Sequence, residues 1–267
     1  MSDNLPVASR EPVFNVPTVL LALIASLFLV HAGRMWLLTQ DGDLDFLLWF
    51  AFIPIRYDST LLQSVTPAGA IPDGIGPQIW TFVTYAFLHA DWTHVFVNTV
   101  WLLPFGAAVA RRFGTLRFVL MFAVTSIAGA LAHLFTHLGE LVFMIGASGA
   151  VSGLMAASVR FAFQSGGPIE NWRRADAASY LIPAAPLSVA LRNPRVVIFV
   201  LVWFAVNALF GSGVVGVPGG PQDIAWQAHV GGFIAGLFLF PLFDPVGASQ
   251  HKAADEDHND DSDPSIR

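Results

Sequence analysis

Long apolar segments constrain this chain more than any other feature of its sequence. A membrane-spanning helix needs about 20 mostly apolar residues, and six segments of roughly that length follow one another along the 267 residues. Charged residues make up only 12% of the chain, about half the share found in a soluble domain. In lipid, every backbone N–H and C=O group must form its hydrogen bond within the protein. The sequence therefore predicts an all-α membrane protein with six transmembrane helices.

The predicted spans divide the chain into three parts. We expect spans at about 16–38, 93–110, 116–138, 147–165, 195–213 and 226–243, with an N-terminal segment, 1–15, before them and an acidic tail, 244–267, after them. The first span is longer than the apolar core of a signal peptide, so we interpret it as a retained helix. The run Phe46–Ile55 is too short to span and should lie at the interface or re-enter the membrane. Residues 166–194, which include Pro183 and Pro186, should form a connector.

The placement of basic residues predicts the orientation. Cytoplasmic loops carry the excess of Lys and Arg, and eleven of the thirteen basic residues flank one side of the predicted spans. Arg34 and Arg56 fall on the other side, and we expect Arg34 and His31 to reach toward the interface. Both termini should therefore be cytoplasmic. The compact layout favours a bacterial-type plasma membrane, and the like charges of the tail predict disorder.

Composition also excludes several classes of function. The net charge of −6 argues against a nucleic-acid-binding protein, which needs a basic surface. The chain has no cysteine, so thiolate nucleophiles and cysteine metal sites are absent. His133 and His137 lie four residues apart with Glu140 nearby, a spacing that could bind a metal. Their place at the outer end of a span instead favours ordinary interfacial residues, and we predict no metal and no cofactor.

Four polar residues inside the predicted spans are the candidates for function: His94, Asn98, Ser148 and His229. Such residues are costly in lipid and are often functional. At 1.5 Å per residue they lie about 18–25 Å above the cytoplasmic ends of their helices, in one layer of a hydrocarbon core about 30 Å thick. A shared depth on three helices indicates a common site.

Small residues should bring Ser148 and His229 together, because small residues at one-turn spacing let membrane helices approach closely. They are Gly149, Gly153, Gly232 and Gly236. A serine beside a histidine is the minimal activated nucleophile. Gly146 permits an unusual turn before the helix, and a helix N-terminus can stabilise an oxyanion. Each feature alone has an ordinary packing explanation, and the combination favours catalysis.

Three motifs, in this order, resemble the rhomboid intramembrane serine proteases. They are His89-Ala-Asp-Trp-Thr-His94-Val-Phe-Val-Asn98, Gly146-Ala-Ser148-Gly149 and Ala228-His229-Val-Gly-Gly232-Phe-Ile-Ala-Gly236. The resemblance covers about Ile79 to Phe243 and implies a six-helix rhomboid-like bundle. It implies that Ser148 is the nucleophile and His229 the general base, with no carboxylate. It further implies an oxyanion hole of His94, Asn98 and the Ser148 N–H, a supporting role for His89, and packing roles for Gly232 and Gly236.

Two positions depart from the pattern of this family. Ser152 stands where the family often has an aromatic residue that stacks on the histidine. Trp80 and Thr81 stand where it often has Trp-Arg. If Ser152 cannot orient His229, another group must do so.

The sequence therefore predicts an intramembrane serine endopeptidase that cleaves single-span membrane proteins within or near the lipid bilayer. Two alternatives stay open: a catalytically inactive relative that binds transmembrane helices, and a small transporter that uses the polar residues of the spans. A transporter predicts inverted repeats, and we find none in the sequence. The substrate, the cleavage site and the oligomeric state do not follow from the sequence.

Overall fold

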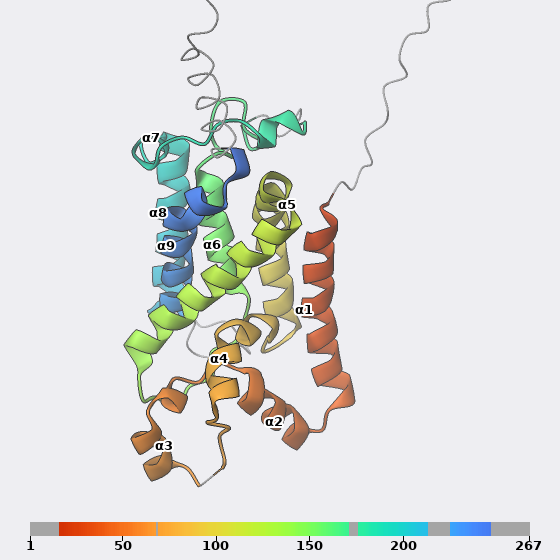
Figure 1. Cartoon of the computed structure of the whole chain (residues 1–267), viewed down its shortest axis with the longest axis vertical. Coiled ribbons are helices and arrows are strands. Elements are labelled where there is room, and N and C mark those ends of the chain that lie inside the picture. The colour runs from red at the N-terminus through yellow and green to blue at the C-terminus, as the bar shows by residue number, and fades with distance from the viewer. Residues whose placement is uncertain (1–15, 68, 171–175, 213–224, 247–267) are drawn as a thin grey trace, which may run out of the picture.

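The computed structural model describes residues 16–67, 69–170, 176–212 and 225–246. These residues are mainly helical (Figure 1): α1 Thr18–Leu37, α2 Gln40–Phe50, α3 Ser59–Val65, α4 Ile75–Thr84, α5 Trp92–His137, α6 Ser148–Val159, α7 Leu187–Ala190, α8 Pro194–Gly211 and α9 Trp226–Phe243. Short 3-10 turns occupy Pro54–Tyr57, Tyr85–Phe87 and Ala178–Tyr180. Within the described ranges there is no β-strand, and an isolated bridge pairs Phe52 with Met144. The predicted N-terminal segment 1–15 and residues 247–267 of the predicted disordered tail lie outside the described residues.

Among the described residues, three helices are long and apolar enough to cross a membrane: α1, α5 and α9. α5 consists of two helices, because Gly114, with φ 73° and ψ 174°, interrupts the helical path. Glycine adopts such a positive φ without steric cost. The two halves match the predicted spans 93–110 and 116–138, and Figure 1 shows the second half running obliquely away from the turn. α6 and α8 are shorter apolar helices.

α6 is shorter than the predicted span 147–165. It ends at Val159, and residues 160–170 continue as turns in which Ile169 N–H donates to the Ala162 carbonyl at 3.0 Å. Gly166, Gly167 and Pro168 in this stretch disfavour further helix. Eleven of the twelve residues of α6 are buried. This helix is therefore enclosed by protein on nearly every side.

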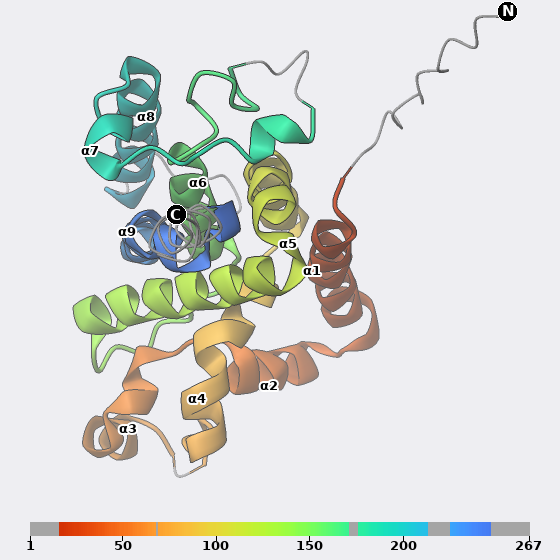
Figure 2. The ribbon, with the colours of Figure 1, turned by 45° about the horizontal axis from the view of Figure 1, so that its top comes forward.

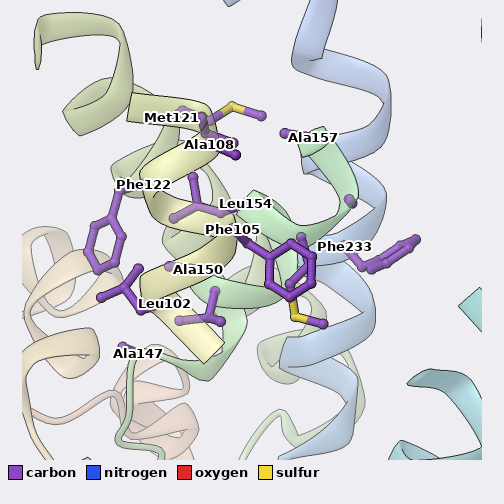
Figure 3. Close-up of a cluster of buried hydrophobic side chains, with 14 of the residues drawn as sticks. Leu102, Phe105, Ala108, Met121, Phe122, Ala147, Ala150, Leu154, Ala157 and Phe233 are labelled. Atoms are coloured by element: carbon purple, nitrogen blue, oxygen red, sulfur yellow. The ribbon is translucent and has the colours of Figure 1, made fainter. Parts of the chain in front are cut away.

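α6 packs against both α5 and α9 (Figure 2), and glycines let the backbones of α6 and α9 meet. A methyl group on Gly232 would lie 2.0 Å from the Gly149 carbonyl oxygen, and one on Gly236 would lie 2.0 Å from that of Gly153. The predicted close approach of these two segments is confirmed. Larger side chains fill the core between α5, α6 and α9 (Figure 3), among them Leu102, Phe105, Met121, Phe122, Leu154 and Phe233.

Different segments close the two ends of the bundle. α2, α3 and α4 gather at one end and the segment between α6 and α8 covers the other (Figure 1). At the α6–α8 end, Arg112 donates to both carboxylate oxygens of Asp244 at 2.9 Å and to the carbonyls of Tyr180 and Ile182. This buried group joins α5, the connector and the end of α9. Asp244, which the sequence-based division assigns to the tail, is thus packed into the bundle.

Arg34 and His31 are buried at the end where α2–α4 lie. Arg34 is 4% exposed, and it donates to Asp43 at 2.7 Å and to the His89 carbonyl at 2.7 Å. His31 is fully buried with its ring edge-on to Trp92. Arg34 and His31, which we expected to reach toward the interface, are thus packed inside the protein. The physical reason is that Asp43 on α2 neutralises the guanidinium inside the protein.

Candidate active site

Ser148 and His229 are in direct contact although 81 residues separate them. Ser148 Oγ lies 2.7 Å from His229 Nε2. Ser148 is the first residue of α6, and His229 lies in the first turn of α9. The distance is that of a hydroxyl donating to an imidazole nitrogen, the arrangement that activates a serine as a nucleophile.

The backbone before α6 positions Ser148. Gly146 has φ +120°, a value that side chains disfavour, and its N–H donates to the Tyr85 carbonyl at 3.0 Å. A methyl group on Gly146 would lie 2.7 Å from His94 Nε2 and 3.8 Å from Ser148 Oγ. Gly146 is therefore required both by its conformation and by the imidazole packed against it.

His94 and Asn98 lie on the first turns of α5. The side chain of Asp91 caps this helix by accepting from the His94 N–H at 2.8 Å. The Ala90 N–H lies 3.5 Å from His94 Nδ1, which assigns the ring proton of His94 to Nε2, the nitrogen that faces Gly146. Asn98 is 4% exposed, and its amide donates to the His94 carbonyl at 2.9 Å. An N–H of His94 thus points toward the space beside Ser148.

His89 lies in the loop before α5 and is fully buried. Its ring meets that of His94 edge-on, with 4.9 Å between the ring centroids. The pKa of His89 is lowered to about 3, chiefly by burial and in addition by the neighbouring His94, His31 and Arg34. A neutral His89 therefore backs the His94 ring at neutral pH.

Asn207 on α8 is a site residue that the sequence analysis missed. The side-chain oxygen of Asn207 lies 2.5 Å from His229 Nδ1, and the side chain is 9% exposed. Asn207 lies in the apolar stretch VVIFVLVWFAVNALF of α8, and a polar residue in such a stretch is a functional candidate by default. That signal was available in the sequence. What the sequence did not show was that α8 turns this residue toward His229.

The two departures from the family pattern have structural counterparts. Ser152 donates to the Ser148 carbonyl at 2.8 Å and makes no hydrogen bond to His229, so the orienting contact comes from Asn207. Thr81 lies on α4 and accepts a hydrogen bond from Arg56 at 3.3 Å. Arg56 is 1% exposed, and its other donors bind main-chain carbonyls at Leu48, Ala51 and Pro72. A guanidinium therefore reaches Thr81 from another segment.

A cavity of about 210 Å³ opens at the end of α5. Its lining comes from the end of α5, the segment before α6 and the start of α9: His133, His137, Glu140, Val142, Phe143, Met144, Gly211, Ala225, Trp226 and Gln227. Met144 precedes Ser148 by four residues, and Ala225 precedes His229 by four. The rings of His133 and His137 stack with 4.1 Å between centroids. Polar side chains thus line part of this cavity.

Comparison with known proteins identifies the family. The Rhomboid domain family model matches residues 76–244, a range that contains every site residue described above. The chain is 26% identical over 203 residues to the rhomboid protease GluP of Bacillus subtilis, covering 72% of this chain and 32% of GluP. It is 24% identical over 162 residues to the rhomboid protease GlpG of Yersinia pestis, covering 61% of this chain and 47% of GlpG.

The matched region thus spans between about a third and about half of the length of these two relatives. The family match covers well over half of this chain, and its apolar helices suit a lipid environment. The chain belongs to the rhomboid family and is an integral membrane protein.

Proposed function

We propose that this protein is an intramembrane serine endopeptidase that uses Ser148 and His229. The observation that carries the proposal is the 2.7 Å contact between Ser148 Oγ and His229 Nε2 at the N-terminus of α6. The two relatives that are named rhomboid proteases support the same class of reaction. A catalytically inactive relative or a transporter would not need a hydroxyl and an imidazole at this distance.

The proposed reaction is acyl transfer through a covalent intermediate. Ser148 Oγ attacks the scissile carbonyl carbon while His229 Nε2 takes the hydroxyl proton. His229 then gives that proton to the departing amine, and the C–N bond breaks to leave an acyl-enzyme. A water molecule, deprotonated by His229, attacks the ester and releases Ser148. The net change is hydrolysis of one peptide bond.

The developing oxyanion needs hydrogen-bond donors that are already in place. The Ser148 N–H at the start of α6, the Nε2–H of His94 and the amide of Asn98 are the proposed donors. The N-terminus of α6 adds the positive end of its dipole. Gly146 keeps the space beside Ser148 open, because a side chain there would collide with His94.

We further propose the arrangement in the membrane. The six spans place both termini in the cytoplasm of a bacterial-type cell, and the end with α2–α4 faces the other side. The site then opens to water at the outer face. Proposed substrates are single-span membrane proteins whose helix unwinds locally, because a helical backbone in lipid has no free carbonyl to attack.

The test is cleavage by purified protein in detergent and in liposomes. Wild type and Ser148→Ala are incubated with a single-span substrate, and mass spectrometry identifies the products. We expect cleavage by wild type and none by Ser148→Ala. Ser158→Ala is the matched control, because Ser158 is a buried serine of the same helix that donates only to the Met155 carbonyl at 2.6 Å. Undiminished cleavage by Ser148→Ala would refute the assignment.

A fluorophosphonate probe distinguishes an active serine protease from a catalytically inactive relative. Labelling of wild type at Ser148, lost in Ser148→Ala and kept in Ser158→Ala, is the expected result for an activated serine. Absence of labelling in wild type, together with binding of the uncleaved substrate, would instead identify a catalytically inactive relative.

A further inference from the structure

We propose that Asn207 is a positioning residue that holds the His229 ring in the tautomer that can accept a proton from Ser148. The kinetic part of this inference rests on the proposed hydrolysis, and the part about the tautomer stands without it. The inference comes from a chain of three hydrogen bonds that runs from a backbone carbonyl on α8 to the serine on α6.

The orientation of the Asn207 amide follows from its first partner. Asn207 Nδ2 lies 2.8 Å from the Trp203 carbonyl oxygen. A carbonyl oxygen only accepts hydrogen bonds, so the NH₂ group of the amide must face Trp203. The amide oxygen then faces away from that carbonyl and toward His229.

The tautomer of His229 follows from the orientation of this amide. Asn207 Oδ1 is a pure acceptor and lies 2.5 Å from His229 Nδ1, so Nδ1 carries the proton. In the neutral ring Nε2 then has a free lone pair, and Nε2 is the atom 2.7 Å from Ser148 Oγ. The proton placement that a general base needs is therefore set by a group on a third helix.

Aromatic packing fixes α8 against α9 at the height where these three hydrogen bonds can form. The ring of Trp203 stacks on that of Phe233, with 4.4 Å between centroids and 26° between planes. Trp203 precedes Asn207 by four residues, and Phe233 follows His229 by four. The stacked rings of Trp203 and Phe233 therefore lie one helical turn from Asn207 and from His229, respectively. Phe204 also contacts Phe233, with 5.9 Å between centroids.

The array around His229 is neutral. Its ring contacts Ser148 from α6 and Asn207 from α8, and His94 on α5 is the titratable group that interacts with it electrostatically. No carboxylate pairs with His229 among the described residues. An amide can set the tautomer as a carboxylate does, and it avoids placing a negative charge in lipid, which is expensive.

The first test measures the tautomer directly. Protein labelled with ¹⁵N at histidine is placed in micelles at neutral pH, and the His229 signals are identified by their loss in His229→Gln. The nitrogen shifts distinguish a protonated from an unprotonated ring nitrogen. We expect a protonated Nδ1 and a bare Nε2 in wild type. A protonated Nε2 in wild type would overturn the inference without any change to Asn207.

The second test removes the acceptor. Asn207→Leu keeps the approximate size of the side chain, and Asn207→Asp keeps an oxygen in the same place. We expect Asn207→Leu to lower kcat by about 10- to 100-fold with little change in KM, since the wrong tautomer cannot act as base. In Asn207→Leu the proton should shift toward Nε2, whereas Asn207→Asp should retain the proton on Nδ1 and most of the activity. Ser158→Ala controls for loss of a buried polar group.

The outcomes separate this inference from the proposed function. Wild type with the expected tautomer but no cleavage leaves Asn207 in its role and refutes the protease. Cleavage with an unchanged kcat and an unchanged Nδ1 proton in Asn207→Leu supports the protease and refutes the role of Asn207.

Discussion

At the scale of single residues, the site is built from groups that are fixed by their neighbours. Asp91 caps the helix that carries His94, and the backbone of Tyr85 holds Gly146 in place. Asn207 holds His229 by its Nδ1. Preorganisation of this kind is what lets hydrogen-bond donors stabilise a transition state without moving.

Asn98 provides a test of the proposed oxyanion hole. Asn98→Ala removes one donor and leaves the Ser148 N–H and His94 in place. Loss of a single donor lowers kcat by about 10²–10³-fold, so we expect slow but measurable cleavage. Complete loss of activity in a folded Asn98→Ala protein, or full retention, would contradict this role. Thr99→Val is the control, because the Thr99 hydroxyl donates to the Val95 carbonyl of its own helix at 2.9 Å.

At the scale of elements, α6 and α9 approach each other backbone to backbone. Gly232 and Gly236 each lie against a carbonyl oxygen of α6, so no side chain separates the two helices there. Small residues allow this approach in membrane helices. The approach is also what brings the first residue of α6 to the first turn of α9. The packing of the glycines and the position of the serine beside the histidine therefore have one cause.

Gly236 allows this contact to be tested. A methyl group in Gly236→Ala would lie 2.0 Å from the Gly153 carbonyl oxygen, so the helices must separate. We expect a loss of stability of about 1–3 kcal/mol and a further loss of activity as Ser148 and His229 move apart. Gly33→Ala on α1 is the control, because a methyl group at Gly33 meets nothing within 4 Å. Thermal unfolding in detergent measures the stability of both variants, and equal unfolding midpoints for Gly236→Ala and Gly33→Ala would contradict the prediction.

At the scale of the whole molecule, buried ionic groups hold the ends of the bundle. Arg112 and Asp244 join segments 132 residues apart at the end away from Ser148. Arg34 and Asp43 join α1 to α2 at the other end, and Arg34 also holds the backbone of the buried His89. Removing one partner of such a pair leaves an uncompensated buried charge. Each pair therefore holds the segments that it joins in place relative to one another.

His89 should make the stability of the whole fold depend on pH. Its pKa is lowered to about 3, chiefly by burial, whereas in the unfolded chain it is about 6.5. Between these values the unfolded chain binds a proton that the folded protein does not, so stability falls as pH falls from about 6.5 toward 3. The slope contributed by one group is at most about 1.4 kcal/mol per pH unit. Unfolding midpoints across this range should fall less steeply for His89→Gln than for wild type, and equal slopes would contradict the prediction.

Much of the helical framework could be predicted because it depends on local sequence. Apolar segments of sufficient length located α1, both halves of α5, α8 and α9, since backbone groups in lipid must bond within a helix. The length of α6 was predicted wrongly because span length assumes contact with lipid, and α6 is surrounded by protein. The helices α2–α4 were not predicted in detail, because their arrangement depends on contacts such as that of Arg56 with the Pro72 carbonyl.

The sequence by itself determined that the chain is helical, apolar and equipped with a serine, an asparagine and histidines at one depth, because helix rise and hydropathy are local properties. Only the tertiary structure decided which of these groups touch. It turned Asn207 toward His229, buried Arg34 against Asp43 and placed His94 against Gly146. The physical reason is that the rotation of each helix about its axis is set by packing against its neighbours, and no single helix encodes it alone.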